Sequence, residues 1–352
     1  MILLFVILLI LVGLLAQKYV LTHSHDAVES DYWPEQNIVE PEEKFDMVIS
    51  LKNKTKRTLH YIRAEHTYYR GISVSARVNG VYRDPGTGSH MVKCSTWLKP
   101  GQHTLLKIPI SISERGRYVF FHPKVYLGDF LGLTEIIQDV NRFREIVVAP
   151  KEWEQPEWKE VLGNFLGDYS VRRFLYEDPV LTIGFREYTG REPMKMISWT
   201  QSARRQSLMV KEYDHTIEPV ISVLLNIESD TADREDVLEK CFSLTRSVCQ
   251  MLEEQGISYD FYTNALQAGS AGDDYMINEG LGKRHFEKIL ESLGRSMYKP
   301  MFSFEKLFEL AETFGGKDRG KIIVTPTEED LGFVYQSSNS SHHILILEAS
   351  KR

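Results

Sequence analysis

One apolar run constrains the fold of this chain more than any other feature. Residues 218–226 contain a nearly continuous hydrophobic run, as expected of a strand that is buried on both faces of a parallel sheet. After it, apolar residues recur at steps of three and four up to Leu252, and Gly256 follows. This spacing predicts an amphipathic helix that ends at the glycine. A strand–helix unit of this kind indicates an α/β domain.

The rest of the C-terminal half repeats the alternation of strands and helices. We expect further strands and helices at residues 257–261, 283–293, 303–313, 321–325 and 343–347. This order predicts an open, mostly parallel sheet with helices on both faces. Such sheets bind ligands at the carboxyl ends of their strands, which here are the loops 226–230, 263–274 and 325–330.

Residues 37–150 have a different pattern. Short segments that alternate polar and apolar residues are separated by turn signals such as Asp84–Gly88. The expected strands lie at residues 44–51, 71–81, 91–97, 102–112, 117–121, 124–127 and 146–149. Many short strands with few helical stretches predict an immunoglobulin-like β-sandwich. The polar segment 23–36 before it is expected to be a linker.

The chain begins with an apolar stretch, Ile2–Ala16, and residues 1–22 approach the ~20 residues that span a bilayer. We expect a single-pass anchor in the cell membrane. A cleaved signal peptide is the alternative, although no basic region precedes the apolar run. Lys18 follows the run, and a positive charge there favours placing the soluble domains in the cytoplasm.

Charge and motifs exclude several classes of function. The formal net charge of -7 argues against a nucleic-acid-binding protein. Three cysteines cannot form a closed disulfide framework, and no cysteine–histidine spacing typical of metal ligands occurs. No nucleophile elbow or complete phosphate-binding loop is present. We therefore expect a protein that is not an enzyme and has no catalytic residues and no cofactor. A hydrolase stays open as an alternative, because a missing motif is weak evidence.

Residues 185–214 concentrate arginine, tyrosine and tryptophan, the residue types enriched at interaction hot spots. They also form a local basic cluster in an otherwise acidic chain. This pattern predicts a protein-binding segment. Its candidate partner-binding residues are Arg186, Tyr188, Lys195, Trp199, Ser202, Arg204, Lys211 and Glu212.

A purely structural interpretation of the same residues stays open. Trp199 and Ile197 would then pack against the sheet. Arg186 and Arg204 would pair with carboxylates nearby, those of Glu187, Glu192 or Glu212. For Arg204 and Lys211, a structural role and contact with a partner are equally compatible with the sequence.

The segment 185–214, the buried strand and the helix after it together resemble the family called domain of unknown function 58. Arg115–Tyr118 and Asp129–Leu133 are similar to a hairpin and a corner of that family's β-domain. The resemblance implies a von Willebrand factor A-like α/β domain over residues 151–352, after an N-terminal immunoglobulin-like β-sandwich and an N-terminal transmembrane helix. Members are often encoded beside MoxR-type AAA+ ATPases. The implied function is a membrane-anchored protein-interaction scaffold that works with such an ATPase.

The resemblance also bears on metal binding. Many von Willebrand factor A-like domains hold a divalent cation through the pattern Asp-x-Ser-x-Ser after the first strand. Here Asn226, Glu228 and Asp230 stand at those positions, so an amide replaces the leading carboxylate. We therefore expect no metal. A recast site built from Glu228, Asp230 and Asp330 is the alternative, and it would make the chain a metal-dependent adhesion or binding protein.

Overall fold

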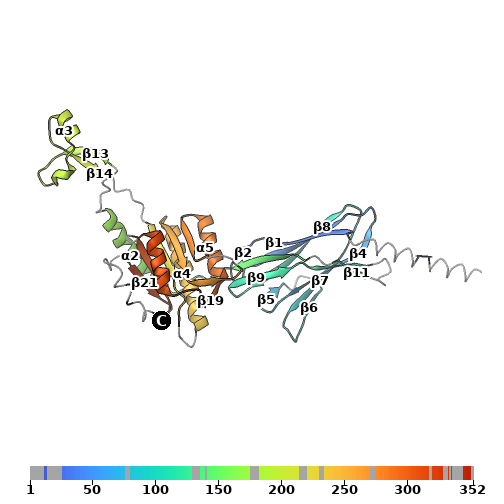
Figure 1. Ribbon diagram of the computed structural model, residues 1–352. Helices are drawn as coiled ribbons and strands as arrows, with labels where there is room; N and C mark the ends of the chain where they lie inside the picture. Colours follow the sequence, from blue (N-terminus) through green and yellow to red (C-terminus); the bar gives the residue numbers. More distant parts are fainter. Residues whose placement is uncertain are drawn as a thin grey trace, which may run out of the picture. The chain divides into compact units, whose positions relative to one another are not determined.

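The computed structural model describes residues 12–13, 26–75, 80–128, 135–138, 141–174, 182–213, 220–229, 234–269, 274–316, 319–327, 332, 334 and 344–349. The chain divides into two compact units (Figure 1). The first comprises residues 1–151 together with 290–296. The second comprises residues 152–289 together with 297–352.

The first unit is a β-sandwich with three sets of paired strands. One sheet has the order β1 (Val28–Pro34), β3 (Lys44–Asn53), β8 (His103–Ile112) and β5 (Ile72–Val74). The second has the order β11 (Glu135–Gln138), β10 (Lys124–Gly128), β4 (Leu59–Tyr68), β7 (His90–Leu98) and β6 (Val81–Arg83). The third joins β2 (Ile38–Val39), β12 (Phe143–Val148) and β9 (Gly116–Phe121).

The sandwich is held together by one hydrophobic core. Side chains of a strand alternate between its two faces, so Met47 and Leu51 of β3 point inward with Ile49. Ile62 and Ala64 of β4 belong to the same cluster. Burying one large aliphatic side chain stabilises a fold by about 1.5–3 kcal/mol, so this shared core accounts for the association of the sheets.

Several strands lie where no strand was expected, and β1 and β4 are the longest of those in the first unit. β1 falls within the segment 23–36 that was predicted to be a linker, and it pairs with β3 along its whole length. That prediction is wrong for residues 28–34, because the acidic residues between Val28 and Tyr32 concealed an alternation of buried and exposed positions. β4 is another unexpected strand, and it lies in the middle of its sheet.

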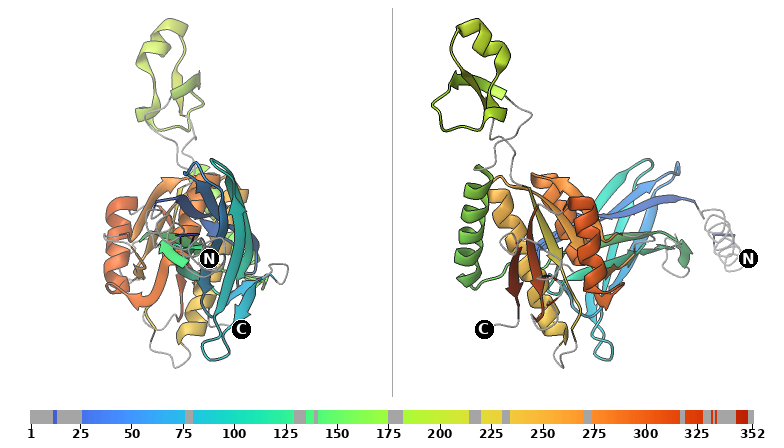
Figure 2. Two further views of the ribbon diagram at one scale, coloured as in Figure 1. Left: turned by 90° about the vertical axis from the view of Figure 1, so that its right-hand side faces the viewer. Right: turned by 60° about the vertical axis from the view of Figure 1, so that its left-hand side comes forward.

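The second unit contains a five-stranded mixed sheet in the order β18, β16, β15, β20, β21. β15 (Val220–Leu225), β16 (Ser258–Thr263), β20 (Gly320–Thr325) and β21 (Ile344–Glu348) are parallel, and β18 (Met276–Gly280) is antiparallel to β16. Helices lie beside this sheet (Figure 2). They are α2 (Glu157–Phe174), α4 (Arg234–Glu254), α5 (Lys283–Arg295) and α6 (Phe304–Gly315). A short pair, β17 (Ala265–Gln267) and β19 (Ser296–Pro300), completes the regular structure described from β15 onward.

The apolar run within residues 218–226 forms β15, in which every residue after Val220 is buried. Helix α4 ends where glycine can take a left-handed conformation. Gly256 has φ +69°, its N–H donates to the carbonyl of Glu253, and the N–H of Ile257 donates to that of Leu252. These bonds satisfy carbonyls that the end of a helix would otherwise leave unpaired.

The fold class predicted from the sequence is wrong. It combined a von Willebrand factor A-like α/β domain with an N-terminal immunoglobulin-like β-sandwich and an N-terminal transmembrane helix. Strand residues far outnumber helical residues in the part of the chain that the structure describes, and residues 182–213 form a separate two-stranded sheet. An apolar run shows that a strand is buried on both faces, but it does not specify the fold in which that strand is placed.

The predicted membrane segment needs the same correction. Among the residues described above, no helix is long and apolar enough to cross a membrane. Of the predicted anchor, residues 1–22, only Val12 and Gly13 are among those residues.

Candidate functional site

The residues predicted to bind a partner lie in a compact segment, residues 182–213, which we call the signature segment. Its framework is the antiparallel pair β13 (Thr182–Glu187) and β14 (Met209–Tyr213). Between the strands lie the 3-10 turn η1 (Met194–Met196) and the short helix α3 (Trp199–Arg205). The pairing sets Phe185 opposite Lys211 and Arg186 opposite Val210, so residues from both ends of the segment are brought together.

The side chain of Ser202 connects α3 to β14 through hydrogen bonds. Its hydroxyl donates to the carbonyl of Ser198 at 2.8 Å and accepts from the N–H of Met209 at 2.8 Å. The N–H of Ser198 in turn donates to the carbonyl of Met209 at 2.8 Å. Ser202 was predicted to contact a partner, but these bonds give it a positioning role within the segment.

Arg186 and Glu192 hold the loop after β13. Arg186 Nη1 lies 2.5 Å from Glu192 Oε1. The N–H of Thr189 donates to Glu192 Oε2 at 3.1 Å, and the Thr189 hydroxyl donates to Glu192 Oε1 at 2.8 Å. These donors, Arg186 first, lower the pKa of Glu192 to about 2. The structural interpretation is therefore confirmed for Arg186, which pairs with one of the three carboxylates proposed for it.

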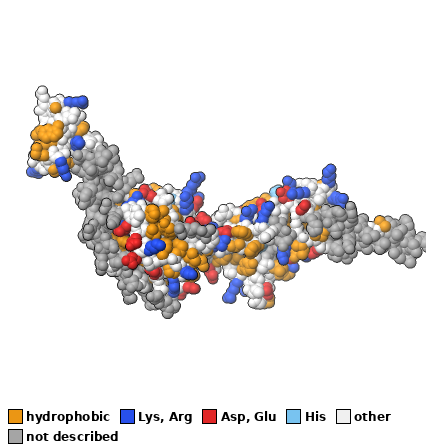
Figure 3. Space-filling model, in the orientation of Figure 1, with side chains coloured by type: hydrophobic (Ala, Val, Ile, Leu, Met, Phe, Trp, Pro, Cys, Tyr) orange, Lys and Arg blue, Asp and Glu red, His pale blue; other side chains and the backbone are white. Residues whose placement is uncertain are grey.

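The same interpretation is right for Ile197 and wrong for Trp199. Ile197 is 6% exposed and bridges to Val210 of β14. Trp199 is 63% exposed, so it does not pack against a sheet. Met194 and Leu208 are also exposed, and Figure 3 shows hydrophobic side chains gathered on this segment next to lysines and arginines. Exposed large apolar side chains that cluster with basic ones are a feature of interaction surfaces.

Five cations of the signature segment have no ion pair or hydrogen bond from their side chains to any residue that the structure describes. They are Arg191, Lys195, Arg204, Arg205 and Lys211. Arg204 and Arg205 lie in the last turn of α3, where a positive charge interacts favourably with the helix dipole. That interaction leaves their donor N–H groups free. The segment contains six basic and three acidic residues, whereas the whole chain has a net charge of -7.

Tyr188 and Glu212 have smaller roles in the arrangement. The backbone N–H of Tyr188 donates to the carbonyl of Leu208 at 2.8 Å, which continues the pairing beyond β13. Glu212 lies opposite Gly184, and a Cβ atom at residue 184 would come within 3.3 Å of Glu212 Oε2. Glu212 is exposed and lies along the hairpin, with its carboxylate close to the backbone of β13.

The second candidate region is the set of loops at the carboxyl ends of β15, β16 and β20, which we call the strand-end region. Asn226 is buried at its centre. Its Oδ1 accepts from Asn264 Nδ2 at 2.9 Å and from the N–H of Glu228 at 3.0 Å. Its Nδ2 donates to Thr325 Oγ1 at 3.1 Å, and Asn264 Oδ1 accepts from the N–H of Ile227. Every polar atom of the Asn226 side chain is thus used within the protein.

The other residues considered as metal ligands, Glu228, Asp230 and Asp330, do not form a metal site among the described residues. Glu228 Oε2 accepts from the N–H of Phe304 at 2.8 Å, so this carboxylate caps the N-terminus of α6 together with Ser303. Asp230 and Asp330 lie outside the residues that the structure describes. Within those residues no three histidine, cysteine, aspartate or glutamate side chains lie close enough together to hold a metal ion.

No family model and no curated protein matches the chain. Solved structures resemble part of it. The CARDB domain of the PF1109 protein from Pyrococcus furiosus is 12% identical, with a TM-score of 0.23 over 34% of this chain and 86% of that domain. A cohesin module from a Clostridium perfringens family 33 glycoside hydrolase is 10% identical, with a TM-score of 0.25 over 35% of this chain and 96% of the module. Similarity at this level carries no argument about function.

Proposed function

We propose that this chain is a non-catalytic protein-binding scaffold and that the signature segment is its contact surface. The observation that carries the proposal is the exposure of Trp199 beside cations without partners in the described chain. Tryptophan and arginine supply much of the binding energy at protein interfaces, because they bury a large area and donate several hydrogen bonds. A tryptophan kept 63% exposed has most of that area still to bury.

The framework of the segment supports this role. Ser202 and Glu192 use their polar atoms to fix α3 and the loop after β13. The exposed side chains therefore stand on a backbone that is already ordered, and a surface ordered before binding loses less conformational entropy when the partner arrives. The surplus of positive charge favours a partner with an acidic surface, because complementary charge speeds encounter and sets orientation.

The partner implied by the family resemblance is a MoxR-type AAA+ ATPase. The test uses the full chain, the purified ATPase of the same organism, and biolayer interferometry. We expect Arg204→Ala with Lys211→Ala to weaken binding at least about tenfold, because exposed charge pairs at an interface act on both encounter and dissociation. The unfolding midpoint should change little, since neither side chain has an ion pair or hydrogen bond within the described chain that its loss would break.

The matched control is Lys44→Ala with Lys52→Ala. Both lysines are exposed on β3 of the sandwich, and their removal changes the net charge by the same amount. Equal binding by the two double variants would show that only overall charge matters and would overturn the proposal for the signature segment. Loss of binding in the control alone would assign the contact to the sandwich.

A further inference from the structure

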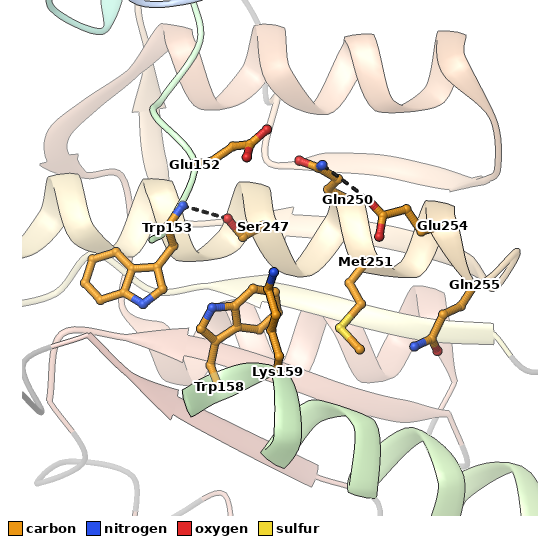
Figure 4. A pocket seen from close by; sticks show the side chains of 9 residues that line it. All are labelled: Glu152, Trp153, Trp158, Lys159, Ser247, Gln250, Met251, Glu254 and Gln255. Carbon is orange, nitrogen blue, oxygen red and sulfur yellow. Dashed lines mark hydrogen bonds between the residues drawn. The ribbon is translucent and has the colours of Figure 1, made fainter. Parts of the chain in front are cut away.

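A hollow of about 180 Å³ lies in the second unit between the start of α2 and the second half of α4 (Figure 4). It is remote in sequence from the signature segment and was not predicted. Apolar surface comes from two tryptophans and a methionine, and polar groups surround it. The lining residues are Glu152, Trp153, Trp158, Lys159, Ser247, Gln250, Met251, Glu254 and Gln255.

The hollow has a fixed wall and an unused donor. The backbone N–H of Trp153 donates to Ser247 Oγ at 2.8 Å, which ties the chain before α2 to α4. Trp158 is 7% exposed, and its indole N–H finds no acceptor among the described residues. A buried donor without a partner costs about 1–3 kcal/mol, so an acceptor brought by a ligand would be favourable here.

A cation already lies against this indole. The ammonium of Lys159, an exposed residue of the same helix, is 5.8 Å from the ring centroid of Trp158. Two carboxylates, those of Glu152 and Glu254, lie at the edge of the hollow. Among the described residues, Glu254 accepts only from the neutral amide of Gln250, at 3.2 Å, whereas Glu152 lies 3.5 Å from the guanidinium of Arg246. Glu254 is thus the carboxylate with capacity for a charged donor.

We propose that this hollow binds an arginine side chain from a peptide segment of a protein partner. The guanidinium replaces the Lys159 ammonium over the indole of Trp158 and donates to Glu254, and a peptide carbonyl accepts the indole N–H. Arginine fits better than lysine, because its planar group can stack on the ring and donate two parallel hydrogen bonds to a carboxylate. The site is independent of the signature segment, so either proposal can fail alone.

The experiment uses the full chain labelled with 5-fluorotryptophan and the probe peptide acetyl-Gly-Arg-Gly-amide. Each of the five tryptophans is assigned in the ¹⁹F NMR spectrum by substitution. We expect saturable shifts at Trp153 and Trp158 and none at Trp33. The citrulline peptide, which has the same shape without the charge, should bind about tenfold more weakly.

Variants separate the contributions. Glu254→Gln should weaken binding of the arginine peptide about two- to fivefold, as expected for the loss of one exposed ion pair. Trp158→Phe keeps an apolar ring but removes the N–H, and it should weaken binding about fivefold, with the shift read at Trp153. Lys159→Gln should strengthen binding, because it removes a competing cation.

Three outcomes would overturn the proposal. The first is equal binding of the arginine and citrulline peptides, and the second is tighter binding of acetyl-Gly-Glu-Gly-amide. The third is an absence of shifts at both Trp153 and Trp158 while the thermal unfolding curve is that of the folded chain. Glu254→Gln keeps the test valid if Trp158→Phe does not fold, because Glu254 is an exposed side chain.

Discussion

The strand-end region and the signature segment use polar side chains in opposite ways. Around Asn226, amides, a hydroxyl and backbone groups satisfy one another, and Glu228 serves as a helix cap. In the signature segment, internal bonds fix only the framework, five cations have no partner among the described residues, and the large aromatic side chain of Trp199 is exposed. The comparison shows that a site at the expected place in a sheet can be closed by its own hydrogen bonds. A surface whose internal bonds fix only its backbone can still have capacity for binding.

The largest expected effect comes from breaking the strand-end region. Asn226→Leu removes the acceptor for two donors, the N–H of Glu228 and Asn264 Nδ2, and it removes the donor to Thr325 Oγ1, all in a buried place. We expect the free energy of unfolding to fall by about 3 kcal/mol or more, measured by urea denaturation. The matched control is Asn278→Leu on β18, where the side chain is exposed, and it should change stability by less than about 0.5 kcal/mol.

An intermediate effect is expected from loosening the framework of the signature segment. Ser202→Ala deprives the N–H of Met209 of its acceptor, so the junction of α3 and β14 should open more readily, by about 1–2 kcal/mol. Amide hydrogen exchange at Met209 reports this opening directly. Thr200→Ala, at an exposed position of the same helix, should leave the exchange rate unchanged. Equal effects of the two substitutions would remove the assigned role of Ser202.

A pH-dependent effect is expected in the loop after β13. The pKa of Glu192 is about 2 in the folded chain against an ordinary 4.5, so its ionised form is favoured by folding. The stabilisation is therefore present above about pH 4.5 and is lost as the pH falls through about 2. Hydrogen exchange of the Thr189 amide should speed up beyond its intrinsic pH dependence over this window. Glu192→Gln should show no such extra change, and an identical profile in both proteins would contradict the assignment.

The smallest effect on stability is expected at the residue with the largest expected effect on binding. Trp199→Ala should change the free energy of unfolding by less than about 0.5 kcal/mol, because the side chain is mostly exposed. It should weaken the ATPase complex at least about tenfold, as loss of a hot-spot tryptophan does. Ile197→Ala is the reverse control, since Ile197 is buried and its loss should lower stability. Comparable stability losses in both variants would show that Trp199 is a core residue.

Several strands were predictable because they follow simple periodicity. β3 and β8 lie close to their expected bounds, and β15 forms from the continuous apolar run. β4 was missed because half of its inward positions are not aliphatic. His66 is buried, and its ring forms a hydrogen bond with the carbonyl of Phe121. Tyr68 is fully buried. Because neither side chain is aliphatic, the sequence shows no clear apolar alternation there.

Only part of the candidate site was predictable from the sequence. Arg186 and Ser202 bond with residues four to seven positions away, but residue type alone does not specify which neighbour each side chain contacts. The exposure of Trp199 could not be read either, because an isolated tryptophan is compatible with a core or a surface. The hollow beside Trp158 depends on α2, whose helical pattern is weakened by Gly163 and Gly167.

The most direct test of the account compares the two regions in one experiment. Amide hydrogen exchange of the full chain is measured with and without a saturating amount of the MoxR-type ATPase. The account predicts new protection in residues 194–211 and unchanged exchange at residues 226–228. Protection at residues 226–228 with none in the signature segment would contradict it.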